Sequence, residues 1–286
     1  MPAVPWRRDF PQLKWLLDQW LLERDGLPLR EHRSLVLPVS RLGRRLMLKI
    51  VHDRTEFEQE LDALVAFADV GAIEVLEDSR PQHAMLLARA AGTDLASLWS
   101  PDRDSAHTRV LVRAADRLST AIVPVTRRIP SLDQHLSVLR RLDLPLPADV
   151  EQIRSLAADL QDRLTATTER VSLLHADLHH ENLLTDGLTA IVIDPLAAIG
   201  DPLYDTAPML HNPCDQLADL TDSDLATMTE RRVALIAELL DADPGRVAGW
   251  GLVRAAASVV WSYEDGDTYA TLNVPLRCAQ ILAALI

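Results

Sequence analysis

The feature that most constrains this chain of 286 residues is a polar loop between two short apolar runs near its middle. The first run, 171–174, leads into a loop that contains Asp177 and, five residues later, Asn182. The second run, 190–193, ends directly at Asp194. Two short strands flanking a loop would bring these three side chains to one mouth, so the sequence predicts a site that they share.

The three side chains are of the types that phosphoryl transfer requires. Magnesium prefers hard oxygen ligands, usually one or two protein carboxylates or amides, so Asn182 and Asp194 suit the metal. A further carboxylate must orient the attacking hydroxyl and accept its proton, which suits Asp177. An Asp and an Asn five residues apart, followed by an Asp at a strand end, are typical of the catalytic loop and metal site of kinases. The sequence therefore predicts a kinase that uses ATP and magnesium.

The chain as a whole divides into two parts of different character. Residues 1–90 show helical periodicity, a strand hairpin, a second helix capped by Thr55 with Glu58, and a second hairpin. After Gly92 helical patterns dominate. We therefore predict an α+β fold with a small sheet-containing N-lobe, 1–90, and a larger, mainly helical C-lobe, 91–286. The expected helices of the C-lobe are 105–123, 132–142, 148–166, 224–240, 244–263 and 273–285, and the expected N-lobe strands are 34–39, 46–51, 73–76 and 84–88.

Composition limits the partners of the chain. Its formal net charge of −13 argues against nucleic acid, because binding a phosphate backbone needs a basic surface. An acidic cleft would instead concentrate a cationic small molecule, although acidic composition is also common among cytosolic proteins. Two cysteines without C-x-x-C spacing fit a reducing compartment. The chain has no apolar run of about 18 residues and no secretory apolar core at its N-terminus, so we expect a cytoplasmic protein that spans no membrane.

The region from His175 to Asp205 resembles the aminoglycoside phosphotransferase family. It particularly resembles the streptomycin 6-phosphotransferase (aminoglycoside/hydroxyurea antibiotic resistance kinase) branch. That branch has a similar Asp-Leu-His-His-x-Asn loop, an Ile-Asp-Pro metal strand and a following Gly-Asp-Pro-x-Tyr-Asp, which are here 177–182, 193–195 and 200–205. The resemblance covers most of the chain, through Ser34-Leu-Val-Leu-Pro-Val, Leu48-Lys49, Gly92-Thr-Asp-Leu95 and Trp261-Ser-Tyr-Glu-Asp-Gly266.

The resemblance implies a bilobal, protein-kinase-like fold with ATP between the lobes and magnesium on its phosphates. It implies O-phosphorylation of a small hydroxyl-bearing molecule, an aminoglycoside of the streptomycin type, with Asp177 as catalytic carboxylate and Asn182 and Asp194 as metal ligands. Two alternatives stay open, because a fold does not fix its substrate. One is a kinase of the same fold that acts on an unidentified metabolite, and the other is a catalytically silent nucleotide-binding module.

The N-lobe is then expected to supply the phosphate anchor. Lys49 lies in the second apolar strand run, where its side chain would project into the cleft and hold the α- and β-phosphates. A helix carboxylate must brace such a lysine. Glu60 is the predicted partner, because its setting before Leu-Asp-Ala-Leu matches the branch pattern, and Glu56 is the alternative. The other interpretation of Lys49 is an exposed charge on an edge strand.

The chain departs from protein kinases where a glycine-rich loop would cover the phosphates. We expect the hairpin 38–45 in this place, and its single glycine, Gly43, cannot form the same cradle. Arg41, Arg44 or Arg45 of this hairpin could approach the phosphates, although solvated loop arginines are the simpler interpretation.

Histidines cluster around the predicted loop. His175 lies where kinases have a histidine that supports the loop from beneath, so we expect a structural role. His179 either hydrogen-bonds the transferring phosphate or shapes the turn. The cluster also allows a metal-dependent hydrolase, for which His211 is the nearby further ligand, but this interpretation explains Asn182 and Asp194 less well.

Residues late in the chain are candidates for binding the substrate. Trp261, Glu264 and Asp265, followed by Asp267, could face the cleft and bind a cation, or could form an ordinary helix end. Asp205 is expected to be a structural carboxylate that ties the metal-binding segment to a helix, rather than a substrate contact.

Overall fold

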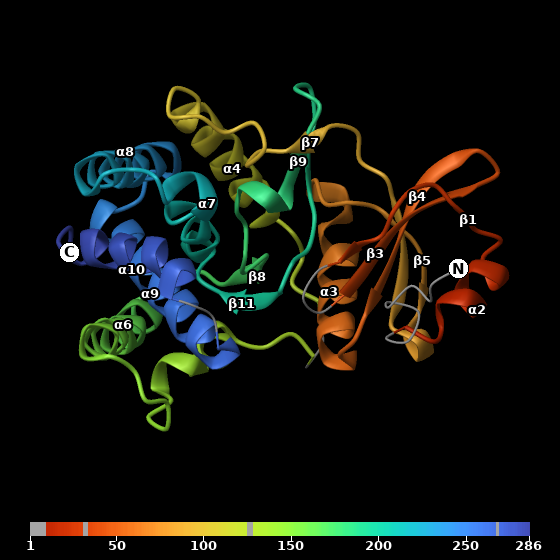
Figure 1. The fold of residues 1–286 in the computed structure, drawn as a ribbon. Coiled ribbons are helices and arrows are strands. Elements are labelled where there is room, and N and C mark those ends of the chain that lie inside the picture. Colours follow the sequence, from red (N-terminus) through yellow and green to blue (C-terminus); the bar gives the residue numbers. More distant parts are fainter. Residues whose placement is uncertain (1–9, 31–33, 125–127, 267–268) are drawn as a thin grey trace.

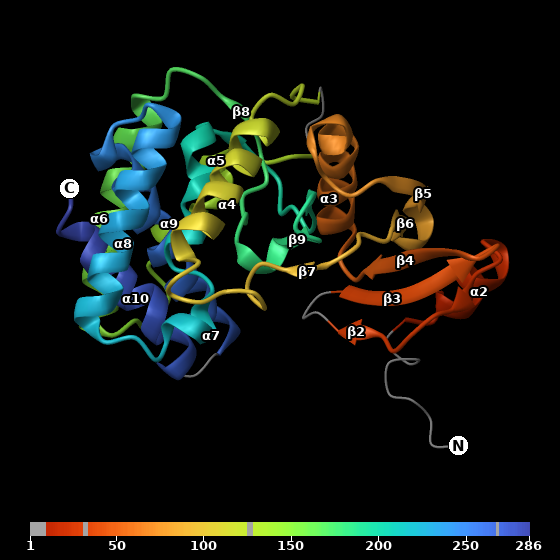
Figure 2. The same ribbon diagram turned by 90° about the horizontal axis from the view of Figure 1, so that it is seen from above.

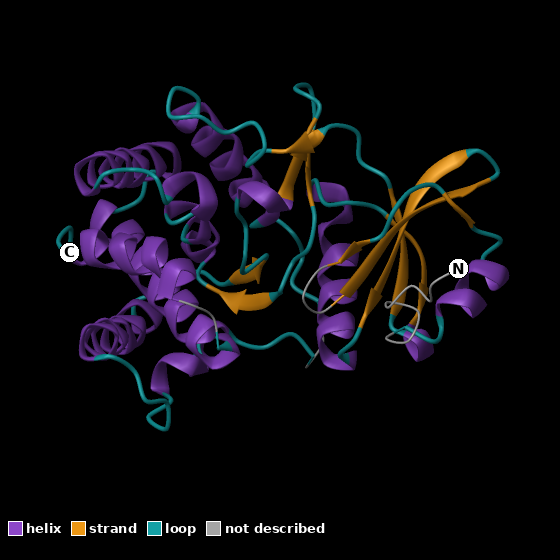
Figure 3. Ribbon diagram, in the orientation of Figure 1, coloured by secondary structure: helices purple, strands orange, loops and turns teal. Residues whose placement is uncertain are grey.

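The computed structural model describes residues 10–30, 34–124, 128–266 and 269–286. A β-rich part comes first in the chain and lies beside a larger, mainly helical part (Figures 1 and 3). The predicted α+β fold is therefore confirmed. The predicted boundary at residue 90 falls in the connection between β6 (Ala84–Ala88) and β7 (Thr93–Asp94).

Among the described residues, the β-rich part contains one antiparallel sheet of six strands. Its strand order is β1-β3-β4-β6-β5, and β2 also pairs with β3. The register of the central β3–β4 hairpin sets Val36 opposite Lys49. The strands are β1 (Glu23–Arg24), β2 (Leu29–Arg30), β3 (Ser34–Arg41), β4 (Arg44–Val51), β5 (Val75–Ser79) and β6.

The two faces of this sheet pack against different helices, because side chains alternate between the faces along each strand. Leu46 and Leu48 of β4 belong to the outer face, which α2 (Leu13–Gln19) covers. Lys49 follows Leu48 in the strand, so its side chain lies on the opposite, inner face of the sheet. This inner face packs against α3 (Arg54–Phe67). Figures 1 and 2 both show α3 between the sheet and the helical part.

The cap of α3 is Asp53 and not the predicted residue. Oδ1 of Asp53 accepts hydrogen bonds from the backbone N–H groups of Thr55 (2.7 Å) and Glu56 (2.9 Å). The predicted capping box of Thr55 and Glu58 is wrong, since Glu58 instead accepts a hydrogen bond from Arg54 (2.9 Å). A carboxylate and a hydroxyl stood two residues apart in the sequence, and the carboxylate makes the stronger, charge-assisted cap.

The helical part is organised around α9 (Pro244–Asp265), which is apolar and buried over most of its length. Three long helices, α6, α8 and α10, pack around it. The predicted bounds of α6 are confirmed, whereas the predicted helix 132–142 breaks after α5 into a 3₁₀ turn, η3. The remaining bounds are α4 (Asp104–Leu118), α5 (Leu132–His135), η3 (Ser137–Arg140), α6 (Ala148–Ala166), α7 (Cys214–Leu217), α8 (Asp222–Leu240) and α10 (Tyr269–Ala283). None of the helices in the described ranges is long and apolar enough to cross a membrane.

Short strands position the loops of the helical part. β8 pairs with β11, and β9 pairs with both β10 and β7. The backbone of Val192 donates a hydrogen bond to Gly71 and accepts one from Ile73, each 2.9 Å long, so β10 is bonded directly to the segment that follows α3. These strands are β8 (Ser172–Leu174), β9 (Leu183–Thr185), β10 (Ala190–Val192) and β11 (Ala198–Gly200), with 3₁₀ turns at Ala68–Val70, Arg80–Gln82, His180–Asn182, Pro202–Thr206 and Pro208–Leu210.

Hydrophobic packing also joins the two parts. A large cluster of buried side chains runs from α3 and β6 through the short strands to α9. A separate, smaller cluster fills the outer face of the sheet beneath α2. The inner face of the sheet therefore shares its core with the helical part.

Gly92 allows the connection between the two parts to pass close to β9. Its φ is +93°, a left-handed conformation that residues with a Cβ rarely adopt. A Cβ at this position would lie 1.9 Å from the carbonyl oxygen of Thr185, so the chain could not keep its present path. A glycine is therefore required here on two independent grounds.

We expect Gly92→Ala to destabilise the protein more than Gly187→Ala. Gly187 has a similar φ of +89°, but no atom lies within 4 Å of the position of its missing Cβ. Both variants carry the strain of a left-handed alanine, about 1–2 kcal/mol, and only Gly92→Ala adds an overpacking term of ~1–3 kcal/mol. Urea unfolding of the two variants measures the difference. Equal losses would show that the close approach to Thr185 does not limit this position.

Candidate active site

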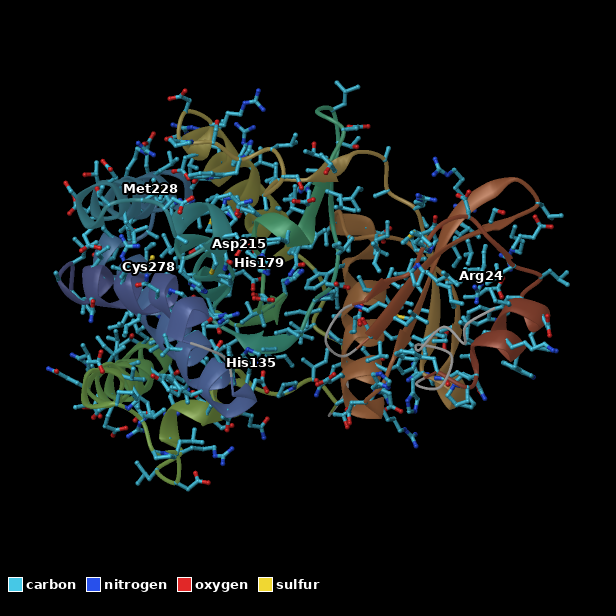
Figure 4. The ribbon with its side chains drawn as sticks, viewed as in Figure 1. Arg24, His135, His179, Asp215, Met228 and Cys278 are labelled. Atoms are coloured by element: carbon cyan, nitrogen blue, oxygen red, sulfur yellow. The ribbon has the colours of Figure 1, made fainter. Side chains whose placement is uncertain are left out.

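A cavity of about 570 Å³ lies between the sheet, α3 and the helical part, and it brings most of the predicted site residues together. Figure 4 labels two lining residues, His135 and His179, on the side of the helical part that faces the sheet, whereas Arg24 lies in the sheet well away from them. The lining residues are Ser34, Lys49, Val51, Glu56, Gln59, Glu60, His135, Asp177, His179, Asn182, Asp194, Pro195, Leu196, Arg254 and Trp261.

The loop that carries Asp177 rests on His175, which is fully buried. Nε2 of His175 donates to the carbonyl oxygen of Ile193 (2.8 Å), and Nδ1 accepts a hydrogen bond from the backbone N–H of Asp177 (3.2 Å). This tautomer is assigned from the partners, because a carbonyl oxygen can only accept. Burial lowers the pKa of His175 to about 4, so the ring is neutral and can make both bonds. These contacts agree with the predicted structural role of His175 beneath the loop of Asp177.

Asp205 holds the same loop from the other side. Its carboxylate oxygens accept hydrogen bonds from the backbone N–H groups of His175 (2.9 Å) and Ala176 (2.8 Å). Ala176 has a φ of +66°, a strained conformation for alanine that these bonds stabilise. Asp205 is structural, as expected, but it does not tie the predicted metal-binding segment to a helix. It holds the loop of Asp177 instead, because the turn Pro202–Thr206 packs against β8.

The carboxylate of Asp177 lies between two cationic side chains. Nη2 of Arg254 donates to its Oδ1 (2.6 Å), and Nε2 of His179 lies 3.3 Å from its Oδ2. Burial alone would raise the pKa of Asp177, but the charges of His179 and Arg254 outweigh burial and hold the pKa well below its usual range. Asp177 is therefore an ionised and oriented carboxylate, which can accept a hydrogen bond from a hydroxyl group.

His179 contacts carboxylates through both ring nitrogens. Besides the contact with Asp177, Nδ1 lies 2.5 Å from Oε2 of Glu181. Burial would lower the pKa of His179, but the two carboxylates raise it to about 10. The amide nitrogen of Asn182 also lies 3.2 Å from Nε2 of His179. In the protonated ring both of these nitrogens are donors, so they form no hydrogen bond with each other. The two carboxylates therefore determine the charge of the ring. The contacts suit the turn-shaping role, and a contact between His179 and the transferring phosphate stays a prediction.

Lys49 joins the sheet, α3 and the segment that carries Asp194. Nζ of Lys49 donates to Oε1 of Glu60 (2.9 Å) and also contacts Oδ1 of Asp194. Lys49 and Glu60 are only 5% and 7% exposed, and a charge so buried requires an opposite charge nearby. The interpretation of Lys49 as an exposed edge charge is wrong, because β4 lies inside the sheet between β3 and β6. Glu56, the alternative partner, also lines the cavity.

Asn182 and Asp194 are brought close together by their backbone. The N–H of Ile193 donates to the carbonyl oxygen of Asn182 (3.0 Å), and a φ of +59° turns the chain at Asp194. The side-chain nitrogen of Asn182 donates to the backbone carbonyl of Asp177 (2.9 Å), so Oδ1 is the amide atom that can bind a metal. An amide oxygen and a carboxylate are donors that Mg²⁺ prefers, and the residues present therefore fit a magnesium ion.

The sequence left open whether the hairpin 38–45 covers the phosphates, and no residue of this hairpin belongs to the described lining of the cavity. Its tip, Leu42–Gly43, lies at the opposite end of the two strands from Ser34 and Lys49, because the hairpin is paired in register along its whole length. Its arginines are held by nearby carboxylates: Arg41 by Glu77, Arg44 by Glu74, and Arg45 by Asp25. Ser34, at the start of β3, lines the cavity instead, and residues 31–33 before it lie outside the described ranges.

Of the three predicted substrate-binding residues, Trp261, Glu264 and Asp265, only Trp261 belongs to the described lining of the cavity. Its ring packs edge-on against that of His135, with 5.3 Å between the centroids. The guanidinium carbon of Arg254 lies 4.9 Å from the centroid of the Trp261 ring. Trp261 therefore forms a wall with one aromatic neighbour and one cationic neighbour.

Glu264 and Asp265 lie near the C-terminal end of α9, outside the described lining. Glu264 contacts Arg141, and Asp265 is exposed. Asp267 lies outside the described residues. A role for Glu264 and Asp265 in binding substrate stays a prediction.

Sequence reasoning missed Arg254 and His135. Arg254 follows Asp177 by 77 residues, so no local spacing connects them. The signal that could have found Arg254 is its setting, since it is the sole charged residue in the apolar stretch 247–260. His135 stands at the end of a four-residue helix, and burial lowers its pKa to about 4, so it contributes a neutral ring to the wall.

His211, the further ligand that a hydrolase would need, has a different role. It is buried, and its Nε2 lies 3.2 Å from Oγ of Ser258. Within the part of the chain that the structure describes, no three or more His, Cys, Asp or Glu side chains are grouped so that they could hold a metal ion. His211 therefore supports α9 and does not join the residues of the cavity.

The fold is protein-kinase-like. The family model for aminoglycoside/hydroxyurea antibiotic resistance kinases matches residues 19–266, and the chain belongs to this family. It is accordingly a small-molecule kinase, which transfers phosphate to an alcohol group.

Curated relatives and solved structures resemble the chain along most of its length. Streptomycin 6-kinase of Streptomyces griseus is 30% identical over 266 residues, which are 88% of this chain and 82% of that protein. Streptomycin 3″-kinase of Klebsiella pneumoniae is 30% identical over 258 residues, 87% of this chain and 92% of that protein. The structure of a thermostable mutant of aminoglycoside phosphotransferase APH(4)-Ia with ADP and hygromycin B has a TM-score of 0.70 at 18% identity, covering 95% of this chain and 97% of the other. A choline/ethanolamine kinase family protein of Mesorhizobium loti has a TM-score of 0.70 at 19% identity, with 96% and 94% covered. The two structures establish the fold.

We expect the contribution of Asp205 to stability to fall as the pH rises from about 4 to about 7. Burial raises the pKa of Asp205 from 3.8 to about 7, although the two backbone N–H groups lower it. The folded protein therefore holds a proton that the unfolded chain has released throughout this window. The free energy of unfolding then decreases with rising pH, by up to ~1.4 kcal/mol per pH unit from this group.

Urea unfolding of the wild type and of Asp205→Asn across this pH window measures the effect. The variant should be less stable overall, because an amide can accept only one of the two loop hydrogen bonds, but its stability should decrease less steeply with pH. Asp159→Asn, at an exposed position of α6, should keep the wild-type slope. The same slope in all three proteins would mean that Asp205 is ionised throughout.

Proposed function

We propose that this protein transfers the γ-phosphoryl group of ATP, with Mg²⁺, to a hydroxyl group of an aminoglycoside of the streptomycin type, and so inactivates it. The observation that carries the proposal is a single cavity lined by Lys49, Asp177, Asn182 and Asp194. Relatives that are 30% identical are streptomycin kinases, which supports the substrate class.

In this reaction Lys49 would hold the α- and β-phosphates, and Glu60 would keep the lysine in place. Asn182 and Asp194 would hold Mg²⁺, which when bound neutralises charge on the transferring group. Asp177 would accept a hydrogen bond from the substrate hydroxyl and take its proton as the new phosphorus–oxygen bond forms and the bond between the γ-phosphorus and ADP breaks. Because cationic neighbours keep the pKa of Asp177 low, its main contribution is to orient the hydroxyl, which suits a loose transition state.

The wall of the cavity that Trp261 and His135 form suits a polar molecule built of rings. Ligand sites combine aromatic surfaces with a few polar groups that fix orientation. Trp261 and His135 supply the aromatic surface. Nε2 of His135 is buried without a hydrogen-bond partner among the described residues, so a substrate hydroxyl could satisfy it. The net charge of −13 would in addition attract a cationic aminoglycoside.

The N-lobe, 1–90, and the C-lobe, 91–286, would hold ATP between them, and nucleic acid would not be a partner. A cytoplasmic location would give the protein access to ATP.

We expect the purified protein to consume ATP when Mg²⁺ and streptomycin are both present. Asp177→Asn should lower kcat by about 10²–10⁴-fold, because the amide keeps the shape of the side chain but loses the negative charge that orients the hydroxyl and accepts its proton. ADP release measures turnover against a panel of streptomycin, other aminoglycosides, hydroxyurea and small sugar alcohols. Phosphorus–proton NMR of the product identifies which hydroxyl is phosphorylated. This measurement is needed because a 6-kinase and a 3″-kinase are equally similar to the chain, each at 30% identity.

Asp159→Asn, the exposed aspartate of α6, is the matched control and should keep wild-type turnover. Turnover of a sugar alcohol but of no aminoglycoside would contradict the substrate and favour a metabolite kinase. Binding of ATP without turnover of any compound would favour a catalytically silent module. Near-wild-type turnover by Asp177→Asn would remove Asp177 from the mechanism.

A further inference from the structure

Arg254 is a buried cation in an apolar stretch of helix. It is 6% exposed, and the residues from 247 to 260 include no other charged side chain. A charge buried in such surroundings must be balanced by well-placed partners. The identity of those partners therefore indicates what the arginine does.

Three contacts fix the guanidinium of Arg254. Nη2 donates to Oδ1 of Asp177 (2.6 Å), and Nη1 donates to Oγ of Ser258 one turn along α9. The ring of Trp261 lies against the guanidinium at 4.9 Å. The spacing of four and then three residues puts Arg254, Ser258 and Trp261 on one face of α9, and this face forms a wall of the cavity.

The orientation of the Asp177 carboxylate depends on this contact. The backbone of Asp177 is held by His175, but a backbone bond leaves the side-chain torsions free. His179 approaches Oδ2 at 3.3 Å, which is longer than the 2.6 Å between Arg254 and Oδ1. Arg254 therefore makes the stronger of the two side-chain contacts and sets the plane of the carboxylate.

We propose that Arg254 is a positioning residue, whose guanidinium holds the Asp177 carboxylate in the orientation that accepts the substrate hydroxyl. The inference rests on the proposed function, in which Asp177 orients that hydroxyl. Arg254 then acts on the rate of phosphoryl transfer and not on the binding of ATP or of the acceptor. A lysine can replace it only in part, because an ammonium is a point charge without the planar donors of a guanidinium.

Arg232 of α8 provides a matched control within the chain. It is 1% exposed and also binds an aspartate, donating from Nε to Oδ1 of Asp104 (3.0 Å). Its other acceptors are the carbonyl oxygens of Met209 and Asn212. These partners are absent from the described lining of the cavity. A change at Arg232 should therefore weaken the fold without altering Asp177.

Steady-state kinetics of Arg254→Ala and Arg254→Lys test the inference. We expect kcat of Arg254→Ala to fall about 10²-fold, the size of effect that a displacement of about 1 Å causes. The KM values for ATP and streptomycin should stay within about threefold of the wild type. Arg254→Lys should be intermediate. Guanidinium ion at millimolar concentration should restore part of the kcat of Arg254→Ala and none of that of Asp177→Asn. Arg232→Lys should lower the free energy of unfolding but keep the kcat of the folded enzyme.

Three kinetic results would overturn the inference. An unchanged kcat with unchanged KM values would do so, as would an unchanged kcat with a raised KM for streptomycin, because Arg254 would then bind substrate. A loss of kcat that Arg232→Lys shares and that guanidinium does not restore would make Arg254 merely structural.

A crystal structure of Arg254→Ala separates this inference from the proposed function, since it requires no turnover. The absence of wild-type turnover with every acceptor would contradict the proposed function. Even if the proposed function fails in this way, the crystal structure of Arg254→Ala should show the Asp177 carboxylate turned away from its wild-type orientation. An unchanged carboxylate would overturn the positioning role, whatever the substrate is.

Discussion

The buried ammonium of Lys49 is the point at which the separate elements of this protein must meet. It comes from an inner strand of the sheet, and its carboxylate partners come from α3 and from the end of β10. A cation that is 5% exposed is stable only if those carboxylates stay beside it. The sheet, α3 and the segment that carries Asp194 are therefore held together by one charge. The backbone hydrogen bonds of Val192 to Gly71 and Ile73 make a similar connection without charge.

The sequence predicted correctly that Asp177, Asn182 and Asp194 lie together, because the information there is local. Asp177, Asn182 and Asp194 are close in the chain, and short strands on either side leave few ways to arrange them. The bounds of α6 were predictable for the same reason, since helical periodicity is a property of neighbouring residues. Lys49 and Glu60 required the resemblance to a family, because a strand lysine alone can equally be an exposed charge.

What could not be predicted depends on contacts between distant segments. Arg254 reaches Asp177 only after the helices around α9 have packed, and no motif records that contact. The position of the hairpin 38–45 has a similar cause, since the register of β3 and β4 and not their composition decides which end meets the cavity. The choice of Asp53 over Thr55 as helix cap was a competition between two adequate residues, which sequence alone leaves undecided.

Among the described residues, Ala176, Asp194 and Ala197 have positive φ although none of them is a glycine. Conformations of this kind cost about 1–3 kcal/mol each and persist only where the surroundings enforce them. The loop around Asp177 is thus already shaped before any substrate arrives, and the cost of shaping it lowers the stability of the empty protein instead of slowing each turnover. Selection for stability alone would favour residues that relax this backbone. A relaxed backbone would no longer hold the carboxylates of Asp177 and Asp194 in their present orientations. The residual instability of the resting enzyme is in that sense a measure of how far its site is prepared in advance.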